Sequence, residues 1–301
     1  MSLFTKLVVV SLPIIPKSIV RLVAQRYIAG PHLVDAVAVT KDLMARGASS
    51  TIDVLGEFVS SRERAIADTA IQASVIDAIH GNGLASYLSV KLTSLGLDID
   101  HDFAYENVSS LVKKAAALGV FVRMDMENTP YTDITLDFYR RLRRDGHNNV
   151  GVVIQAYLRR SEADVLSLLA YDPSVRLCKG IYVESEDHAF KDPEEIRSSY
   201  RSLLRLLLSA KGQTHIATHD EALIVDAEKL LAERLLPKER YEFEMLLGVR
   251  EDRRNILIRN GHPVRIYVPF GEDWYGYSTR RLKENPQVAG YVAKAILTGR
   301  G

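Results

Sequence analysis

One segment near the C-terminus combines a strand, a turn and a helix: Val264-Arg-Ile-Tyr-Val-Pro-Phe-Gly-Glu-Asp-Trp-Tyr-Gly-Tyr-Ser-Thr-Arg-Arg-Leu-Lys-Glu-Asn285. Its first residues are apolar and β-prone, and Pro269 and Gly271 interrupt them. From about Tyr275 the pattern becomes helical, and we expect the helix to end at Asn285 because proline follows. A strand followed by a helix is the repeating unit of parallel α/β folds.

The predicted last helix has a charged side. A 3.6-residue period places four residues there: Tyr277, Arg280, Arg281 and Glu284. Two adjacent guanidinium groups form a fork that holds both oxygens of a small carboxylate in fixed geometry. The alternative is a solvated helix face with i,i+4 ion pairs, which is common in arbitrary sequences. The rest of the chain favours the carboxylate site.

Upstream of this segment, the chain repeats a short β-rich run followed by a longer helical run. The predicted strands are Thr51–Leu55, Ser86–Leu92, Val120–Met126, Val150–Tyr157, Val175–Tyr182, His215–His219, Tyr241–Leu246 and Val264–Pro269. This alternation indicates a parallel sheet with right-handed crossovers, and the number of strands predicts a closed (β/α)8 barrel of the TIM type. Because no linker divides the sequence, we expect an N-terminal helical arm over residues 1–48 and a catalytic barrel domain over residues 49–301.

Composition excludes several classes of protein. With 47% hydrophobic and 26% charged residues, the 301-residue chain is an ordinary globular protein. A net charge of +1 and the lack of a basic stripe with interleaved aromatic residues argue against nucleic acid as a partner. The single cysteine, Cys178, excludes an internal disulfide and favours a reducing compartment.

The N-terminus has two interpretations. Residues 7–12 resemble the apolar core of a signal peptide, but Pro13 and Pro16 break the run, which is far below the roughly 20 residues that span a bilayer. Residues 16–28 form an amphipathic pattern with Lys17 and Arg21 on its basic side. Such a helix packs on its own domain in most proteins, and the alternative is a peripheral contact with a membrane surface.

Active residues of (β/α)8 barrels lie at the carboxyl ends of the strands. The predicted strand ends carry Lys91, Asp125 with Glu127, Gln155, Arg176 with Lys179 and Tyr182, Thr218 with His219, Glu244, and Tyr267. Period-two alternation places Arg176, Gly180 and Tyr182 on one face of their strand. We therefore expect Lys179 to point away from the pocket that the other three face.

Two further motifs are not interpreted as a dinucleotide site or a metal site. Gly81-Asn-Gly83 precedes a strand, whereas a dinucleotide-binding glycine motif follows one. His215 and His219 lie on a strand-like run without a partnering Glu motif, so no metal site is predicted.

The ordered strand-end motifs resemble those of the monofunctional bacterial proline dehydrogenases. They are Ser89-Val-Lys-Leu92, Arg123-Met-Asp-Met-Glu127, Gln155-Ala-Tyr157, Arg176-Leu-Cys-Lys-Gly-Ile-Tyr182, Ala217-Thr-His-Asp220, Phe243-Glu-Met-Leu-Leu-Gly248, Arg265-Ile-Tyr267 and Tyr277-Ser-Thr-Arg-Arg-Leu-Lys-Glu284. The resemblance extends from about Thr51 to Pro286. It implies a distorted barrel whose last helix sits over the mouth.

The resemblance also implies a pocket for L-proline. The implied substrate-binding residues are Lys91, Tyr182, Leu246, Tyr267, Tyr277, Arg280, Arg281 and Glu284. Arg280 and Arg281 would hold the carboxylate, and Glu284 would pair with Lys91, while the tyrosines and Leu246 would wall the ring. Asp125 and Arg176 are the implied catalytic residues. The sequence does not decide whether Asp125 accepts a proton from the substrate, because a carboxylate with an ordinary pKa of about 4 is a weak base.

The implied cofactor is FAD. The implied cofactor-binding residues are Met126, Gln155, Arg176, Lys179, Gly180, Ile181, Thr218 and His219. Arg176 would lie against the flavin and favour negative charge as the ring accepts a hydride. Gly180 would permit close approach of the backbone.

The implied reaction is oxidation of L-proline to Δ1-pyrroline-5-carboxylate by hydride transfer to flavin N5. Electrons would pass to a membrane quinone, a separate pyrroline-5-carboxylate dehydrogenase would act downstream, and the enzyme would be cytoplasmic with peripheral contact at the inner face of the membrane. One alternative is a cofactor-free aldolase that forms a Schiff base on Lys91 or Lys179. Another is a barrel that binds an amino acid or a partner without catalysis.

Overall fold

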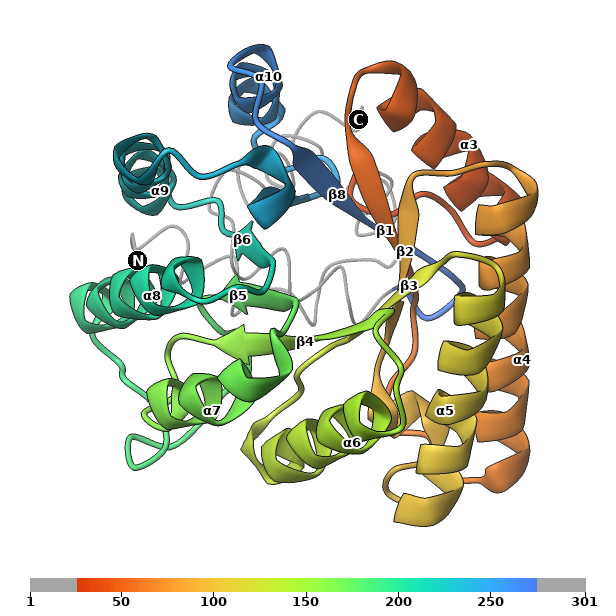
Figure 1. Cartoon of the computed structure of the whole chain (residues 1–301). Coiled ribbons are helices and arrows are strands. Elements are labelled where there is room, and N and C mark those ends of the chain that lie inside the picture. The colour runs from red at the N-terminus through yellow and green to blue at the C-terminus, as the bar shows by residue number, and fades with distance from the viewer. Residues whose placement is uncertain (1–25, 275–301) are drawn as a thin grey trace, which may run out of the picture.

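The computed structural model describes residues 26–274, which form a closed barrel of eight parallel strands (Figure 1). The strands are β1 (Ser49–Val54), β2 (Ser86–Val90), β3 (Phe121–Met124), β4 (Val150–Gln155), β5 (Val175–Cys178), β6 (Thr214–Ala217), β7 (Tyr241–Leu246) and β8 (Val264–Phe270). Each strand pairs with its neighbours in sequence, and β8 closes on β1, where Ser50 lies opposite Ile266. The predicted (β/α)8 barrel is confirmed.

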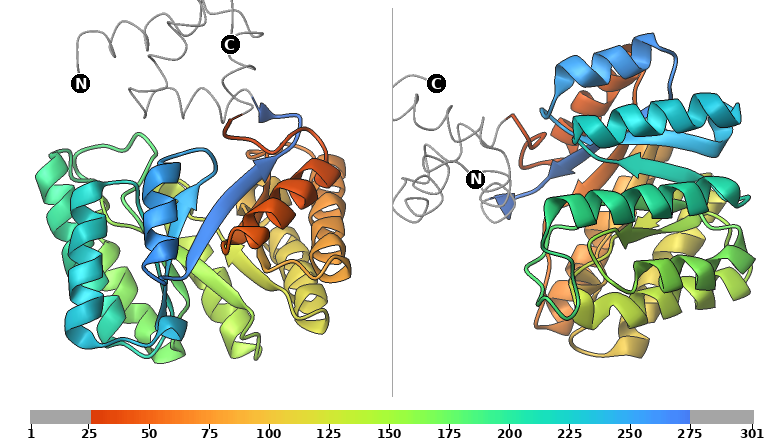
Figure 2. Two further views of the ribbon diagram at one scale, coloured as in Figure 1. Left: turned by 90° about the horizontal axis from the view of Figure 1, so that it is seen from above. Right: turned by 90° about the vertical axis from the view of Figure 1, so that its left-hand side faces the viewer.

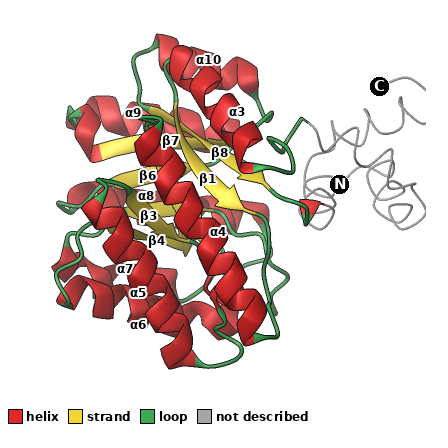
Figure 3. Cartoon of the chain, turned by 90° about the vertical axis from the view of Figure 1, so that its right-hand side faces the viewer, coloured by secondary structure: helices red, strands yellow, loops and turns green. Residues whose placement is uncertain are grey.

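A helix follows each of the first seven strands and covers the outside of the barrel (Figure 2, Figure 3). These helices are α4 (Arg62–Gly81), α5 (His101–Ala117), α6 (Thr132–Arg144), α7 (Ser161–Leu168), α8 (Pro193–Ser209), α9 (Glu221–Arg234) and α10 (Glu251–Arg259). Ser61, Asp100, Asp192 and Asp220 cap four of their N-termini by accepting backbone hydrogen bonds. The expected last helix, with its place over the mouth, lies outside the described residues.

The helix before the first strand belongs to the barrel wall. Helix α3 (Leu33–Ala45) packs against both β8 and β1, and its buried Ala36 and Leu43 join the common core. It thereby covers the seam where the barrel closes, on the outer side that helices occupy in this fold. The amphipathic helix expected over residues 16–28 does not include residues 26–28. Instead Tyr27 and Ile28 are buried, and the Ala29 amide donates to the Pro269 carbonyl at the end of β8 (2.9 Å).

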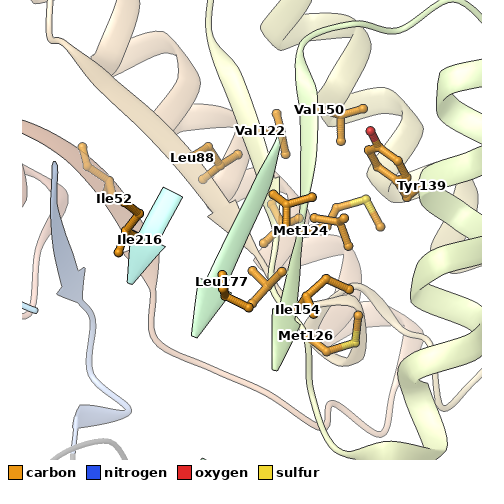
Figure 4. Close-up of a cluster of buried hydrophobic side chains, with 14 of the residues drawn as sticks. Ile52, Leu88, Val122, Met124, Met126, Tyr139, Val150, Ile154, Leu177 and Ile216 are labelled. Atoms are coloured by element: carbon orange, nitrogen blue, oxygen red, sulfur yellow. The ribbon is translucent and has the colours of Figure 1, made fainter. Parts of the chain in front are cut away.

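Alternation along the strands separates an apolar layer from a polar interior. Leu88, Val122 and Leu177 belong to the apolar layer that packs against the helices (Figure 4). On the other face of the strands, seven buried residues bear ionisable side chains: Asp53, Arg123, Arg176, His215, Glu242, Glu244 and Arg265. The barrel therefore encloses a network of charges beneath its mouth.

No helix within residues 26–274 has the length and apolar character that a membrane span requires.

Candidate active site

Asp125 joins three strands at the carboxyl end of the barrel. Its carboxylate accepts hydrogen bonds from Ser89 Oγ on β2 (2.8 Å), from Arg176 Nη1 on β5 (2.7 Å) and from the Tyr267 hydroxyl on β8 (2.8 Å). Because the carboxyl ends of parallel strands meet at one end of a barrel, residues that are 36 to 142 positions apart come together here. Both oxygens of Asp125 are thus engaged as acceptors.

Arg176 is held from two sides. In addition to Asp125, its Nε donates to Glu244 Oε2 on β7 (2.5 Å), and the guanidinium lies over the Tyr267 ring (5.2 Å to the centroid). Burial acts to lower the pKa of Arg176, but Glu244 and Asp125 outweigh burial and raise the pKa above its ordinary value. Among the described residues, its buried Nη2 has no hydrogen-bond partner.

Lys91 is paired with a residue that sequence analysis did not select. Its Nζ lies 2.7 Å from Asp53 Oδ1 on β1 and 4.0 Å from Asp125 Oδ2. Burial lowers the pKa of Lys91, but the two carboxylates outweigh this effect and raise it above the ordinary value, so the amine stays protonated. The predicted partner, Glu284, lies outside the described residues. Asp53 could have been noted as an acidic residue near the carboxyl end of its strand.

The predicted wall residues are placed around this charged cluster. Tyr267 within β8, Leu246 at the end of β7 and Tyr182 after β5 are each partly exposed. Burial, together with nearby carboxylates, raises the pKa of the Tyr182 hydroxyl, which therefore stays neutral. Three further predicted substrate residues, Tyr277, Arg280 and Arg281, lie outside the described residues, as Glu284 does.

The predicted cofactor residues fall into two groups. Met126 and Gln155 are buried beside the cluster, where Gln155 Nε2 donates to the Glu127 carbonyl (2.8 Å). The other group lies at the ends of β5 and β6. There Thr218 Oγ1 accepts from the Asp220 amide (3.1 Å), and His219 Nε2 accepts from the Leu246 amide (2.9 Å).

Lys179 does not join Arg176. Its Nζ lies 3.0 Å from Asp220 Oδ2, at the N-terminus of α9, and its side chain is 43% exposed. Ile181 is exposed as well. The Tyr157 ring packs directly against the backbone at Gly180. A Cβ at this position would collide with that ring, so a glycine is needed here whether or not a cofactor is bound. Alternation does not reach Gly180 and Tyr182 as expected, since β5 ends at Cys178.

Glu127 gives the site an unusual buried carboxyl. It accepts from the Thr93 amide (3.1 Å) and from Thr93 Oγ1 (2.5 Å), and only 1% of its surface is exposed. Burial outweighs these hydrogen bonds and raises the pKa of Glu127 to about 7, from 4.5. The folded state therefore holds a proton between these pH values that the unfolded state has lost, so stability falls as pH rises through about 7.

A Glu127→Gln variant should remove this pH dependence. We compare the free energy of unfolding of the variant with that of the original protein. This difference should shift in favour of the variant by up to about 3 kcal/mol as the pH rises from 5 to 8. Denaturant unfolding of the cofactor-free protein at the two pH values measures the change. Glu233→Gln, at an exposed position of α9, is the control. If the variant and the original protein differed in free energy of unfolding by the same amount at both pH values, the raised pKa of Glu127 would be contradicted.

The geometry defines a class of protein before any comparison. A closed parallel barrel whose strand ends hold buried ion pairs is the architecture of (β/α)8-barrel enzymes. The family model for proline dehydrogenase matches residues 36–294. The chain belongs to the proline dehydrogenase family, flavin-dependent oxidoreductases that carry out the first step of proline catabolism.

Curated relatives agree with this membership, and a solved structure has the same fold. The chain is 38% identical over 277 residues to proline dehydrogenase 1 of Bacillus subtilis, which covers 92% of this chain and 91% of the relative. It is 36% identical over 282 residues to proline dehydrogenase of Deinococcus radiodurans, covering 92% and 90%. The fold matches proline utilization A from Bdellovibrio bacteriovorus with a TM-score of 0.82 and 24% identity, over 87% of this chain and 32% of that longer protein.

Proposed function

We propose that this chain oxidises L-proline to Δ1-pyrroline-5-carboxylate with FAD as the bound flavin. The observation that carries the proposal is the environment of the Arg176 guanidinium. This group is a buried cation whose Nε and Nη1 are bound by carboxylates, while its buried Nη2 has no partner among the described residues. A buried donor without an acceptor is costly, so this atom is suited to an acceptor on a ligand. The bound flavin would supply the hydride acceptor at N5.

The residues divide between cofactor and substrate. Met126, Gln155, Lys179, Gly180, Ile181, Thr218 and His219 would line the flavin together with Arg176. Lys91, Tyr182, Leu246 and Tyr267, with Tyr277, Arg280, Arg281 and Glu284 of the undescribed segment, would hold proline. Lys91 stays protonated beside Asp53, so it contributes positive charge toward the substrate carboxylate. Asp125 would orient Arg176 and Tyr267, which makes it a positioning group at the site.

The protonation of Lys91 also bears on the aldolase alternative. A Schiff base needs a neutral amine, whereas Lys91 is ion-paired with Asp53 and Lys179 with Asp220. The arrangement therefore favours oxidation of the substrate over attack by a lysine.

An anaerobic absorption spectrum before and after addition of L-proline tests the proposed function. We expect a flavin spectrum that bleaches with L-proline and is unchanged by D-proline, and release of the flavin from denatured protein should identify FAD. A bound flavin that ignores proline would overturn the substrate. A colourless protein that FAD cannot reconstitute would overturn the cofactor.

Quinone as electron acceptor, a cytoplasmic location with peripheral membrane contact, and a separate downstream pyrroline-5-carboxylate dehydrogenase complete the proposal. Deletion of residues 1–25 should weaken binding to anionic liposomes while proline oxidation by a soluble dye continues. This deletion spares Tyr27 and Ile28, which are buried. A Lys17→Gln/Arg21→Gln variant is the matched control for charge. Unchanged liposome binding by the truncated protein would contradict membrane contact through this segment.

A further inference from the structure

Two carboxylates on different strands fix the plane of the Arg176 guanidinium. Nη1 donates to Asp125, which follows β3, and Nε donates to Glu244 on β7. A guanidinium held at one nitrogen can still rotate, whereas one held at both Nε and Nη1 has a single orientation. The second contact therefore decides where Nη2 is directed.

Glu244 also contacts a buried histidine in the barrel interior. Its Oε1 lies 2.8 Å from Nδ1 of His215, which is fully buried on β6. On the other side of the ring, His215 Nε2 lies 3.1 Å from both Ser174 Oγ and Gln213 Oε1. Burial alone would raise the pKa of Glu244, but Arg176 and His215 outweigh burial and hold the pKa below its ordinary value. Glu244 is therefore an ionised carboxylate that Arg176 binds and that His215 approaches without completing a hydrogen bond.

Together with Glu242 on the same strand, His215 and Glu244 have the composition of a metal site. However, one oxygen of each carboxylate is already bound by a guanidinium: Arg176 Nε on Glu244 and Arg265 Nε on Glu242 (2.7 Å). A divalent cation would have to displace these arginines within a fully buried interior. The group is better described as part of an ion-pair network.

We propose that Glu244, steadied by His215, is the positioning residue of Arg176 and thereby controls the rate of flavin reduction without contacting proline. This inference rests on the proposed function, because it is there that Arg176 faces the bound flavin. Glu242 offers a matched control. It lies on the same strand, is buried and approaches His215 (3.3 Å), but the arginine with which it is ion-paired is Arg265 and not Arg176.

The test compares Glu244→Gln with Glu242→Gln in flavin-loaded protein. We expect Glu244→Gln to slow anaerobic flavin reduction by L-proline by on the order of tenfold, because the amide oxygen still accepts from Arg176 Nε but the charge that holds the guanidinium in one orientation is lost. The dissociation constant of cyclopentanecarboxylate, a ring carboxylate without nitrogen to oxidise, should change less than about threefold, since the carboxylate grip is intact. Glu242→Gln should reduce its flavin within about threefold of the original rate, with a similar loss of thermal stability.

A double-mutant cycle then separates positioning from other effects. In an Arg176→Lys background, Glu244→Gln should cause no further loss of rate, because it acts through the arginine. An additive loss, or equal loss in the two glutamine variants, would overturn the positioning role. If Arg176→Lys alone reduced its flavin at the original rate, the proposed placement of Arg176 at the flavin would fail instead.

Discussion

Replacement of Asp125 by alanine should lower kcat/KM for L-proline by on the order of 100-fold, whereas asparagine should lower it by only about tenfold. The reason lies in the three hydrogen bonds that Asp125 accepts, from Ser89, Arg176 and Tyr267. Alanine releases all three donors. Asparagine retains one carbonyl oxygen for Arg176, and the Tyr267 hydroxyl can rotate to accept from the new amide.

Steady-state oxidation of proline by a soluble dye measures both variants, with flavin content and thermal unfolding as checks on folding. Ser89→Ala is the matched control, because it removes one of the three bonds and leaves the ion pair with Arg176 intact. A proton-accepting role predicts a different pattern, since asparagine cannot accept a proton in place of a carboxylate. Asparagine and alanine variants of equal, very low activity would make Asp125 a base.

The barrel was predictable because its signal is repeated along the chain. Each β-rich run followed by a helical run points to the same parallel topology, so an error in one run does not change the fold. The meeting of Lys91, Asp125 and Tyr267 was predictable for the same reason, because Lys91 and Asp125 follow the neighbouring strands β2 and β3 and Tyr267 lies within β8, which closes the barrel. Strand order alone therefore brought these three side chains together.

The partners within the interior were not predictable. The sequence does not show which residues Asp53 and His215 contact. Asp53 stands one residue before the end of its strand, but its contact with Lys91, like that of His215 with Glu244, depends on the depth of each side chain in the barrel. The predicted length of the fifth strand was also wrong. Ile181 and Tyr182 are β-prone, but Gly180 adopts a φ of 112°, which leaves the strand conformation, and β5 ends at Cys178.

Gly180→Ala should destabilise the protein by about 3 kcal/mol and reduce its flavin content. Two effects add at this position. The φ of 112° is one that residues with a Cβ rarely adopt, and the new methyl group would lie 2.1 Å from the Tyr157 ring. Tyr157 has little freedom to withdraw, because its side chain is buried and its amide fixes the backbone by donating to the Lys179 carbonyl (2.8 Å). The strain would therefore displace the segment that carries Lys179, Ile181 and Tyr182.

Gly119→Ala separates conformation from crowding. Gly119 also has a positive φ, 68°, but a Cβ there would meet no atom within 4 Å, so we expect a loss of only about 1 kcal/mol and normal flavin content. Denaturant unfolding of the cofactor-free variants and the ratio of flavin to protein measure the two effects. Tyr157→Leu should partly rescue Gly180→Ala, because the smaller side chain relieves the clash but leaves the backbone strain. Equal stability losses for Gly180→Ala and Gly119→Ala would show that the Tyr157 contact carries no energy, and that the conformation of the β5 segment is set by its backbone alone.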